Sequence, residues 1–460
     1  MSALMTVMGV GELSALNAIA GAFAEHVPVI HIIAKPSIQA QNNRLCVHHT
    51  LGDGDFTVFE EMSRKVSCLT VSIDNAQTAP SLIDEAIRTC WIQSRPVSIF
   101  IACDMVRVPI ARHVLSNLPA LDRTMPLGSM LEHRRLVDAV VYEIRQATNP
   151  VILVGGYGVL HGAKRELDGF LRGLEIPVLV AASGLGIVDA NLPYFSGLYV
   201  GYCSSPHVVK LMQSVDLVVC IGNIQSDLST SGFSGVVDVA RLIEIERTKT
   251  KVKGQIFEGV HVNSVLSALT AKLDRSLLPT KTSPTKISVC VDISHEYQPL
   301  AIADANTDEK LSSADQPTRF NSGYQLLSCL RRCATVLHSL WPKLSPIAEH
   351  VTEKQHPITH DVFWMNLGKW LKEGDIILTE TGTSSFGIWN TTFPPDAIFI
   401  AQYLWSSIGY TIGACQGAAM AVRDSDKRQR RTILFTGDGS LQCGCQELST
   451  IIRNDLRPIM

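Results

Sequence analysis

The sequence predicts an α/β protein with three doubly wound domains, each built on a parallel sheet. Two kinds of segment alternate along the chain: amphipathic stretches with helical spacing, and short apolar runs typical of buried strands. Residues 131–275 repeat the alternation of residues 9–118, and a third unit of the same kind begins near residue 360. A chain of 460 residues has room for several domains of about 100–200 residues each.

The composition excludes several other classes of protein. Hydrophobic residues make up 46% of the chain and charged residues 18%, which is typical of a globular protein and not of a disordered one. The net charge of −3 offers no basic field for nucleic acid. We find no apolar run of about 18 residues and no secretory signal, so we expect no contact with a membrane. The 12 scattered cysteines form no C-x-x-C pair and predict reduced thiols in a cytoplasmic protein.

The first predicted domain, residues 1–118, and the second, residues 131–275, show the alternation most clearly. Helices are expected at 11–26, 81–93, 131–147, 163–174, 208–215 and 262–273, and strands at 28–34, 96–102, 150–156, 177–182 and 216–222. A proline-containing stretch, residues 118–129, predicts a linker between the two domains.

Residues 276–355 differ from both of these domains. They are polar and rich in Ser, Thr, Asp and Pro, and so predict a linker or an atypical insertion that lacks a packed core. The third predicted domain, residues 356–460, returns to the α/β alternation.

The segment RTILFTGDGSLQ, residues 431–442, is the most informative motif. A buried strand is followed by the turn Gly437-Asp438-Gly439 and by a helix that begins near Ser440. This order brings backbone N–H groups up to a phosphate, and the Asp438 carboxylate is an oxygen ligand of the kind that Mg²⁺ prefers. An ordinary strand–helix turn is the alternative, because a lone GDG is a weak signal.

Other loops carry weaker signals. Glu380–Ser384 is a hydroxyl-rich loop after an expected strand, or a plain turn. The adjacent His48 and His49 are acid–base groups, metal ligands, or merely exposed or capping histidines. Gly52–Asp55 contains a second GDG, but no clean strand precedes it and no amphipathic helix clearly follows, so we interpret it as a loop. Residues 155–162 contain G-x-G without the third glycine of a dinucleotide fingerprint.

Taken together, these strings resemble the thiamin-diphosphate-dependent 2-oxo acid decarboxylases, in particular their fungal pyruvate-decarboxylating branch. The resemblance covers roughly residues 6–275 and 360–460, and its longest strings are GVGELSALNAIAGAFAEHVPVIHI, HHTLGDGDFTVF, ETGTSSFG, LWSSIGYTIGA and GDGSLQCGCQELSTIIR. It implies the thiamin-diphosphate-binding fold, with a pyrimidine-binding, a central and a diphosphate-binding domain in that order.

The resemblance also implies a role for particular residues. Asp438 is implied as a Mg²⁺ ligand and Thr381 as a residue near the substrate, while the His48–His49 pair relays protons. The residues implied to contact thiamin diphosphate are Thr383, Ser406, Ser407, Ile408, Gly439 and Ser440. Among them, Ile408 is the apolar wedge under the cofactor, and position 406 is usually glycine in the family, with its backbone carbonyl facing the cofactor.

The reaction implied is non-oxidative decarboxylation of a small 2-oxo acid, with pyruvate giving acetaldehyde and CO₂. The thiazolium of the cofactor accepts the electron pair that the departing CO₂ leaves. The resemblance implies a homodimer or homotetramer with sites between subunits. Two other classes stay open: a carboligase of the acetolactate-synthase type with a flavin, and a non-catalytic interaction protein with the same fold.

Three departures from the family pattern affect these expectations. The family's acid–base glutamate upstream of GVGELS and its asparagine pair downstream of GDG have no counterpart in residues 1–460. The first and last domains are therefore expected to be incomplete, truncated at their outer ends, and turnover by these 460 residues to be low. Some fungal members carry a regulatory cysteine in the central domain where this chain has Tyr157 and Gly158, so we do not expect that regulation.

Overall fold

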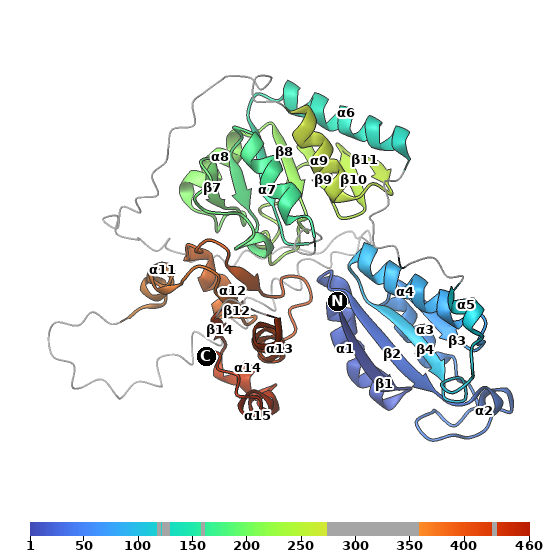
Figure 1. The fold of residues 1–460 in the computed structure, drawn as a ribbon. Helices are drawn as coiled ribbons and strands as arrows, with labels where there is room; N and C mark the ends of the chain where they lie inside the picture. The colour runs from blue at the N-terminus through green and yellow to red at the C-terminus, as the bar shows by residue number, and fades with distance from the viewer. Residues whose placement is uncertain (117–120, 122–128, 158–161, 274–357, 426–429) are drawn as a thin grey trace, which may run out of the picture. The chain divides into compact units, whose positions relative to one another are not determined.

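The computed structural model describes residues 1–116, 121, 129–157, 162–273, 358–425 and 430–460. They form three sheets, which are shown with their helices in Figure 1. The chain divides into two compact units, residues 1–287 with 360–460, and residues 288–359. Apart from residues 358 and 359, the second unit lies outside the described residues, as does the whole of the stretch 276–355 that the sequence predicts as a linker.

The first sheet has four parallel strands in the order β1-β2-β4-β3. They are β1 (Ser2–Val7), β2 (Val29–Lys35), β4 (Val97–Ala102) and β3 (Leu69–Ile73). The helices of this segment are α1 (Val10–Ala24), α2 (Ile38–Asn42), α3 (Val58–Lys65), α4 (Ala79–Gln93) and α5 (Arg112–Ser116). The sequence indicated β2, β4, α1 and α4 but neither β1 nor β3.

The loop at Gly52–Asp55 is confirmed, since no helix or strand covers it. The accompanying statement that no amphipathic helix follows is wrong, because α3 begins at Val58. Its segment VFEEMSRK is short, and only Phe59 and Ser63 are buried, so its apolar stripe is narrow in the sequence.

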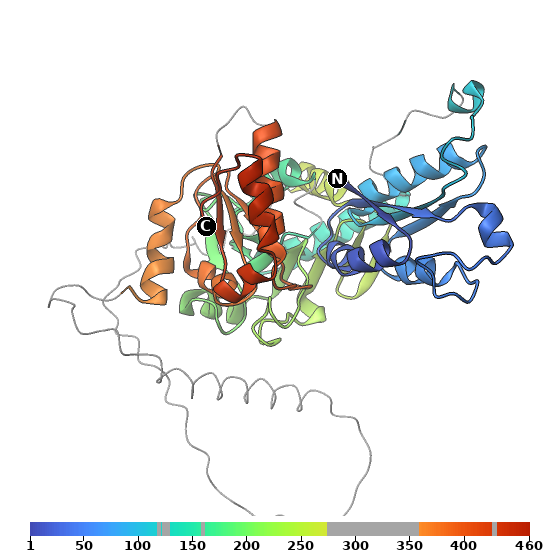
Figure 2. The same ribbon diagram turned by 90° about the horizontal axis from the view of Figure 1, so that it is seen from below.

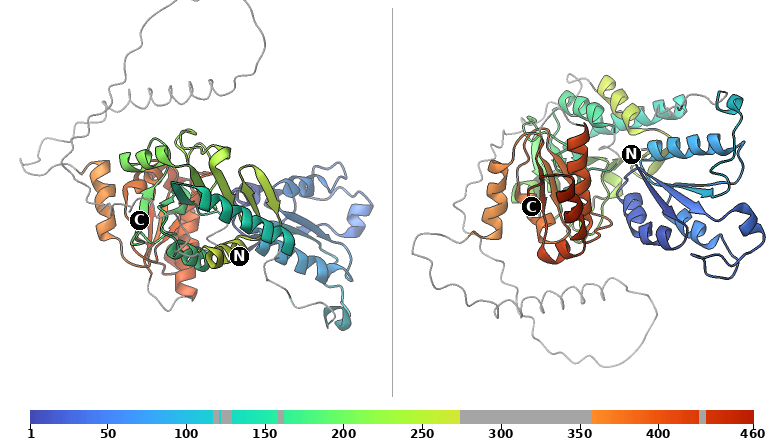
Figure 3. Two further views of the ribbon diagram at one scale, coloured as in Figure 1. Left: turned by 90° about the horizontal axis from the view of Figure 1, so that it is seen from above. Right: turned by 60° about the horizontal axis from the view of Figure 1, so that its bottom comes forward.

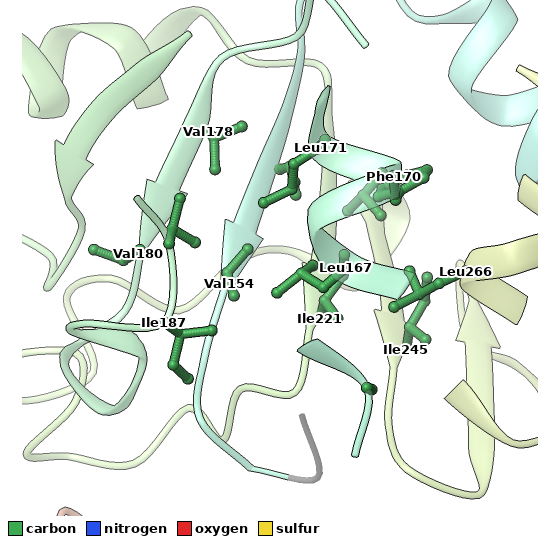
Figure 4. Close-up of a cluster of buried hydrophobic side chains, with 14 of the residues drawn as sticks. Val154, Leu167, Phe170, Leu171, Val178, Val180, Ile187, Ile221, Ile245 and Leu266 are labelled. Carbon is green, nitrogen blue, oxygen red and sulfur yellow. The ribbon is translucent and has the colours of Figure 1, made fainter. Parts of the chain in front are cut away.

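The second sheet has seven strands in the order β11-β10-β9-β8-β5-β6-β7. They are β5 (Pro150–Val154), β6 (Val178–Val180), β7 (Phe195–Leu198), β8 (Leu217–Ile221), β9 (Leu242–Ile245), β10 (Lys249–Val252) and β11 (Gln255–Glu258). Its helices are α6 (Met130–Gln146), α7 (Lys164–Gly173), α8 (Pro206–Ser214) and α9 (Val262–Lys272), with short 3-10 turns at Ala182–Gly184 and Val239–Arg241. Figure 4 shows α7 placing Leu167 and Phe170 against this sheet, where both are fully buried.

One edge of this sheet is antiparallel, which corrects the expectation of a purely parallel arrangement. Strand β10 pairs antiparallel with both β9 and β11. Lys253 and Gly254, with φ of 47° and 87°, form a tight turn between β10 and β11. Two left-handed residues in a row are typical of the turns that close two-residue hairpins.

The third sheet has the order β13-β12-β14, with all pairs parallel. Its strands are β12 (Ile376–Thr379), β13 (Ile398–Ile400) and β14 (Thr432–Phe435). Its helices are α11 (His360–Trp370), α12 (Thr383–Gly387), α13 (Tyr410–Ser425), α14 (Asp438–Gln442) and α15 (Gln446–Arg453), with a 3-10 turn at Ile388–Asn390.

The two faces of the third sheet bury different helices, as Figures 2 and 3 show. Ile376 and Leu378 pack with Ile412 of α13, whereas Ile377 shares the large core cluster with Trp364 of α11. That large cluster also contains the core of the second sheet, so these two domains share buried side chains. The α/β fold class predicted from the sequence is thus confirmed. Among the described residues no helix is long and apolar enough to cross a membrane.

Candidate functional site

Two hydroxyl- and carboxylate-bearing loops leave the third sheet side by side. Strands β12 and β14 are parallel neighbours, with Thr379 opposite Phe435, so the chain leaves both strands at the same edge. The carbonyl of Phe435 accepts the backbone N–H of Glu380 at 2.9 Å and the hydroxyl of Ser384 at 3.3 Å. Thr381 and Thr383 therefore lie on the loop beside the one that carries Asp438.

A buried carboxylate ties the first of these loops to helix α13. Glu380 is 1% exposed. Its Oε1 accepts the N–H of Thr381 at 2.9 Å, and its Oε2 accepts the hydroxyl of Thr411 at 2.6 Å and the N–H of Thr411 at 3.2 Å. The sequence placed Glu380 in the loop without giving it this anchoring role, because Thr411 is distant in the chain.

The segment Ser406–Gly409 meets the GDG loop from the other side. A Cβ built on Gly409 would lie 2.7 Å from Cβ of Cys443 and 3.7 Å from the carbonyl oxygen of Ser440, so the two backbones approach closely. Ser406 adopts a left-handed conformation with φ of 53°. A non-glycine residue is strained there, which gives a physical reason for the glycine that the family usually has at this position.

Gln402 fixes the positions of Ser406 and Ser407. Its side-chain Oε1 accepts the N–H of Ser407 at 2.8 Å, and its backbone carbonyl accepts the Ser406 hydroxyl at 3.3 Å. Beyond it, the Ile408 side chain is 59% exposed, an unusual position for a large apolar group unless a ligand or another surface covers it.

The space in front of the GDG loop is open. Gly437 precedes the first turn of α14, and Asp438 and Gly439 are exposed. A Cβ on Gly439 would meet nothing within 4 Å. The first N–H groups of a helix have no partner within it, so this turn fits a phosphate group.

The donor set is also compatible with Mg²⁺. Among the described residues no three His, Cys, Asp or Glu side chains gather as a metal-binding cluster. Mg²⁺ commonly takes one or two carboxylates and completes its shell with phosphate oxygens and water. Asp438 can supply one such carboxylate.

The histidine pair lies in a different domain. His48 and His49 are both exposed, and their ring centroids are 4.6 Å apart with the planes at 66°. Within the described part of the chain, neither imidazole is hydrogen-bonded to the loops at 381–383, 406–408 or 438–440. The structure thus brings together eight of the ten predicted site residues in one domain and leaves His48 and His49 on the first.

One set of contacts that the sequence did not indicate joins residues of all three domains. Oε1 of Glu25 accepts the N–H groups of Leu404 at 2.8 Å and of Trp405 at 2.7 Å. Its Oε2 accepts the hydroxyl of Tyr157 at 3.0 Å. Burial, followed by the nearby Glu25 charge, raises the pKa of Tyr157 well above its usual range, so this phenol stays protonated and donates.

The G-x-G segment at 155–162 remains an untested prediction, because residues 158–161 lie outside the described residues. Of its described part, the N–H of Gly156 donates to the Ser183 hydroxyl at 3.2 Å.

Comparison with protein-family models identifies the class of protein. Residues 137–271 match the central domain of thiamine pyrophosphate enzymes, and residues 380–460 match their C-terminal TPP binding domain. The second match begins at Glu380 and includes both loops at the edge of the third sheet.

Individual relatives narrow the class. The chain is 37% identical over 460 residues to the pyruvate decarboxylase of Aspergillus fumigatus, covering all of this chain and 70% of that protein. It is 36% identical over 460 residues to the pyruvate decarboxylase of Aspergillus terreus, again with 100% and 70% covered. Pyruvate decarboxylase isozyme 1 of Saccharomyces cerevisiae is 34% identical over 460 residues, with 100% and 71% covered. The chain therefore belongs to the thiamine pyrophosphate enzymes and, among them, is similar to the fungal pyruvate decarboxylases.

Proposed function

We propose that this chain binds thiamin diphosphate with Mg²⁺ at the edge of the third sheet and decarboxylates a 2-oxo acid, with pyruvate giving acetaldehyde and CO₂. The observation that carries the proposal is the convergence of three segments, 380–384, 406–409 and 437–440, around an open turn with one exposed carboxylate. We propose pyruvate as the substrate because these relatives are named pyruvate decarboxylases.

Each residue of the proposed cofactor site has a role that suits its chemistry. Asp438 ligates Mg²⁺, while the backbone of Gly439 and the hydroxyls of Ser440 and Thr383 hold the diphosphate. Hydroxyl and backbone N–H donors suit phosphate oxygens, which accept several hydrogen bonds. The apolar Ile408 side chain supports the cofactor rings, and the backbone carbonyl of Ser406 accepts a hydrogen bond from them.

The reacting carbon requires proton transfer and exclusion of water. When bound, thiamin diphosphate supplies a thiazolium ring that accepts the electron pair released with CO₂. Thr381 orients the substrate, and the imidazoles of His48 and His49 donate and accept protons, a role that suits histidine near neutral pH. These two histidines act at the site of a second copy of the chain.

Cofactor binding is the direct test, because it can be measured without turnover. Trp405 is 40% exposed and adjoins Ser406, so its fluorescence should change when thiamin diphosphate and Mg²⁺ are added together. Asp438→Asn should weaken this binding by about 10–100-fold or more, since the loss of metal-site residues commonly has that effect. Asp455→Asn, an exposed aspartate of the same domain, is the matched control.

A coupled acetaldehyde assay with pyruvate, phenylpyruvate and indolepyruvate then tests the substrate. Saturable binding by the wild type that Asp438→Asn weakens, and Asp455→Asn does not, supports the proposal. Equal affinity of wild type and Asp438→Asn refutes the assigned metal ligand. No binding by the wild type would favour a non-catalytic protein with this fold.

A further inference from the structure

A carboxyl group outside the proposed cofactor site is completely buried in the first domain. Glu12, in the first turn of α1, is 0% exposed. The hydroxyl of Ser63 donates to its Oε1 at 2.5 Å. Its Oε2 has no hydrogen-bond partner among the described residues. A buried polar atom without a partner costs free energy, so this arrangement calls for a structural explanation.

The hydrogen bond between Glu12 and Ser63 joins two elements that lie next to the loop carrying the histidine pair. We call residues 46–57 the histidine loop. Gly9 precedes α1 with φ of 69°, and a Cβ built on it would lie 2.2 Å from the carbonyl oxygen of His49. Ser63 lies on α3, which begins directly after the loop. Glu12 therefore connects the start of α1, where Gly9 lies against His49, with helix α3, which follows the histidine loop.

Apolar contacts fix the base of the same loop. Phe56 and Phe59 share a buried cluster with Met8, and Val47 packs against it. The histidine loop is thus held at both ends, while His48 and His49 between them are exposed. His49 has a left-handed φ of 65°, a strained conformation that the surrounding structure must maintain. Because α1 and α3 pack beside the loop, the direction of the two imidazole rings depends on how firmly these helices are held together.

We propose that Glu12 is a positioning residue for His48 and His49: by joining the start of α1 to α3, it fixes the base of the histidine loop and the direction of both imidazoles. The role of the imidazoles in proton transfer rests on the proposed function, whereas the connection itself does not. Burial raises the pKa of Glu12, although the Ser63 hydroxyl and the backbone of Gly9 act in the opposite direction. A neutral carboxyl or a carboxamide also has an oxygen that can accept the Ser63 hydroxyl.

The test compares variants of Glu12 in the full chain without cofactor. Glu12→Ala removes the acceptor of the Ser63 hydroxyl, and Glu12→Gln retains an acceptor oxygen for it. Glu61→Gln, an exposed glutamate on α3, is the matched control. The readouts are the chemical shifts and the line widths of the C2–H resonances of His48 and His49 in NMR spectra recorded at one pH.

Glu12→Ala should move the C2–H resonances of both histidines and change their line widths, because it removes the acceptor of the Ser63 hydroxyl that connects α1 to α3. Glu12→Gln and Glu61→Gln should resemble the wild type. A folded Glu12→Ala protein with unchanged histidine resonances would overturn the proposal. If Glu12→Ala does not fold, Ser63→Ala decides, because it removes the donor and leaves Glu12 in place; wild-type histidine spectra in that variant would equally overturn it.

The same experiment separates this inference from the proposed function. Both readouts are obtained on the free protein and need no turnover. Wild-type protein that neither binds thiamin diphosphate nor releases acetaldehyde would refute the proposed function and leave the histidine measurements intact. Where turnover is measurable, Glu12→Ala should lower kcat and leave the affinity for thiamin diphosphate unchanged.

Discussion

Replacing Tyr157 with phenylalanine removes one hydroxyl group from the contact at Glu25 that joins residues of the three domains. The side chain is 7% exposed, and phenylalanine fills the same space, so packing is preserved and only the hydrogen bond to Glu25 is lost. Hydrogen bonds to charged groups contribute about 1.5–3 kcal/mol. Because Glu25 is only half-buried and water can replace the phenol, we expect the lower end, about 1.5 kcal/mol.

The effect should appear where Glu25 acts, at the amides of Leu404 and Trp405. Their N–H groups donate to the other carboxylate oxygen of Glu25. A loss of about 1.5 kcal/mol corresponds to roughly tenfold faster hydrogen exchange of these amides, if the contact opens as one unit. Hydrogen–deuterium exchange with mass spectrometry of the peptide containing both residues measures this rate.

Two further variants make the measurement decisive. Tyr142→Phe removes a hydroxyl from an exposed tyrosine of the same domain and should leave the exchange unchanged. Glu25→Ala removes the acceptor, so adding Tyr157→Phe to it should cause no further change. Exchange at wild-type rate in Tyr157→Phe, or a fully additive effect in the double variant, would refute the reasoning.

Four other outcomes are expected. Burial lowers the pKa of His31 to about 4 from its ordinary 6.5, so its contribution to stability is complete above pH 6.5 and is lost as the pH falls toward 4. His31→Asn should reduce the loss of stability that urea unfolding shows at pH 5 by about 2 kcal/mol and leave the part due to His261, whose pKa burial also lowers to about 4. Ser406→Gly should raise the urea midpoint by a stabilisation of about 0.5–1 kcal/mol, because φ at this residue is 53°; a lower midpoint would contradict this. Thiol titration in denaturant without reductant should find 12 free thiols, consistent with the nine described cysteines, all of which are free. Light scattering should find a dimer or a dimer of dimers, because β1 exposes Leu4, Met5 and Val7, and a monomer at micromolar concentration would argue against this.

Much of the fold followed from patterns that are local in the sequence. The buried strand LVVCI of β8 and the amphipathic helix α6 can each be recognised from a short stretch of sequence. The same holds for the strand-end loops at Glu380 and Asp438, whose adjacency follows once two parallel strands are neighbours. By contrast, SALMTV of β1 lacks the alternation of apolar and polar residues that marks a half-buried strand, and nearly all of its residues are exposed in the structure. The short strand β10, KTKV, is missed for a related reason, because its alternate positions are lysines. The four residues of β11, QIFE, include only two apolar ones, and these are adjacent rather than alternating.

The sequence by itself determined the α/β class, the family resemblance and the chemical nature of the candidate site residues, because these depend on residue type and on spacing over one turn or one strand. Only the tertiary structure decided which of these groups touch. Glu25 and Trp405 are 380 positions apart, yet share a hydrogen bond, and Glu12 reaches Ser63 across 51 positions. Such contacts are fixed by the packing of whole helices and sheets, where the free energy is spread over many buried side chains, and no short stretch of sequence contains that information.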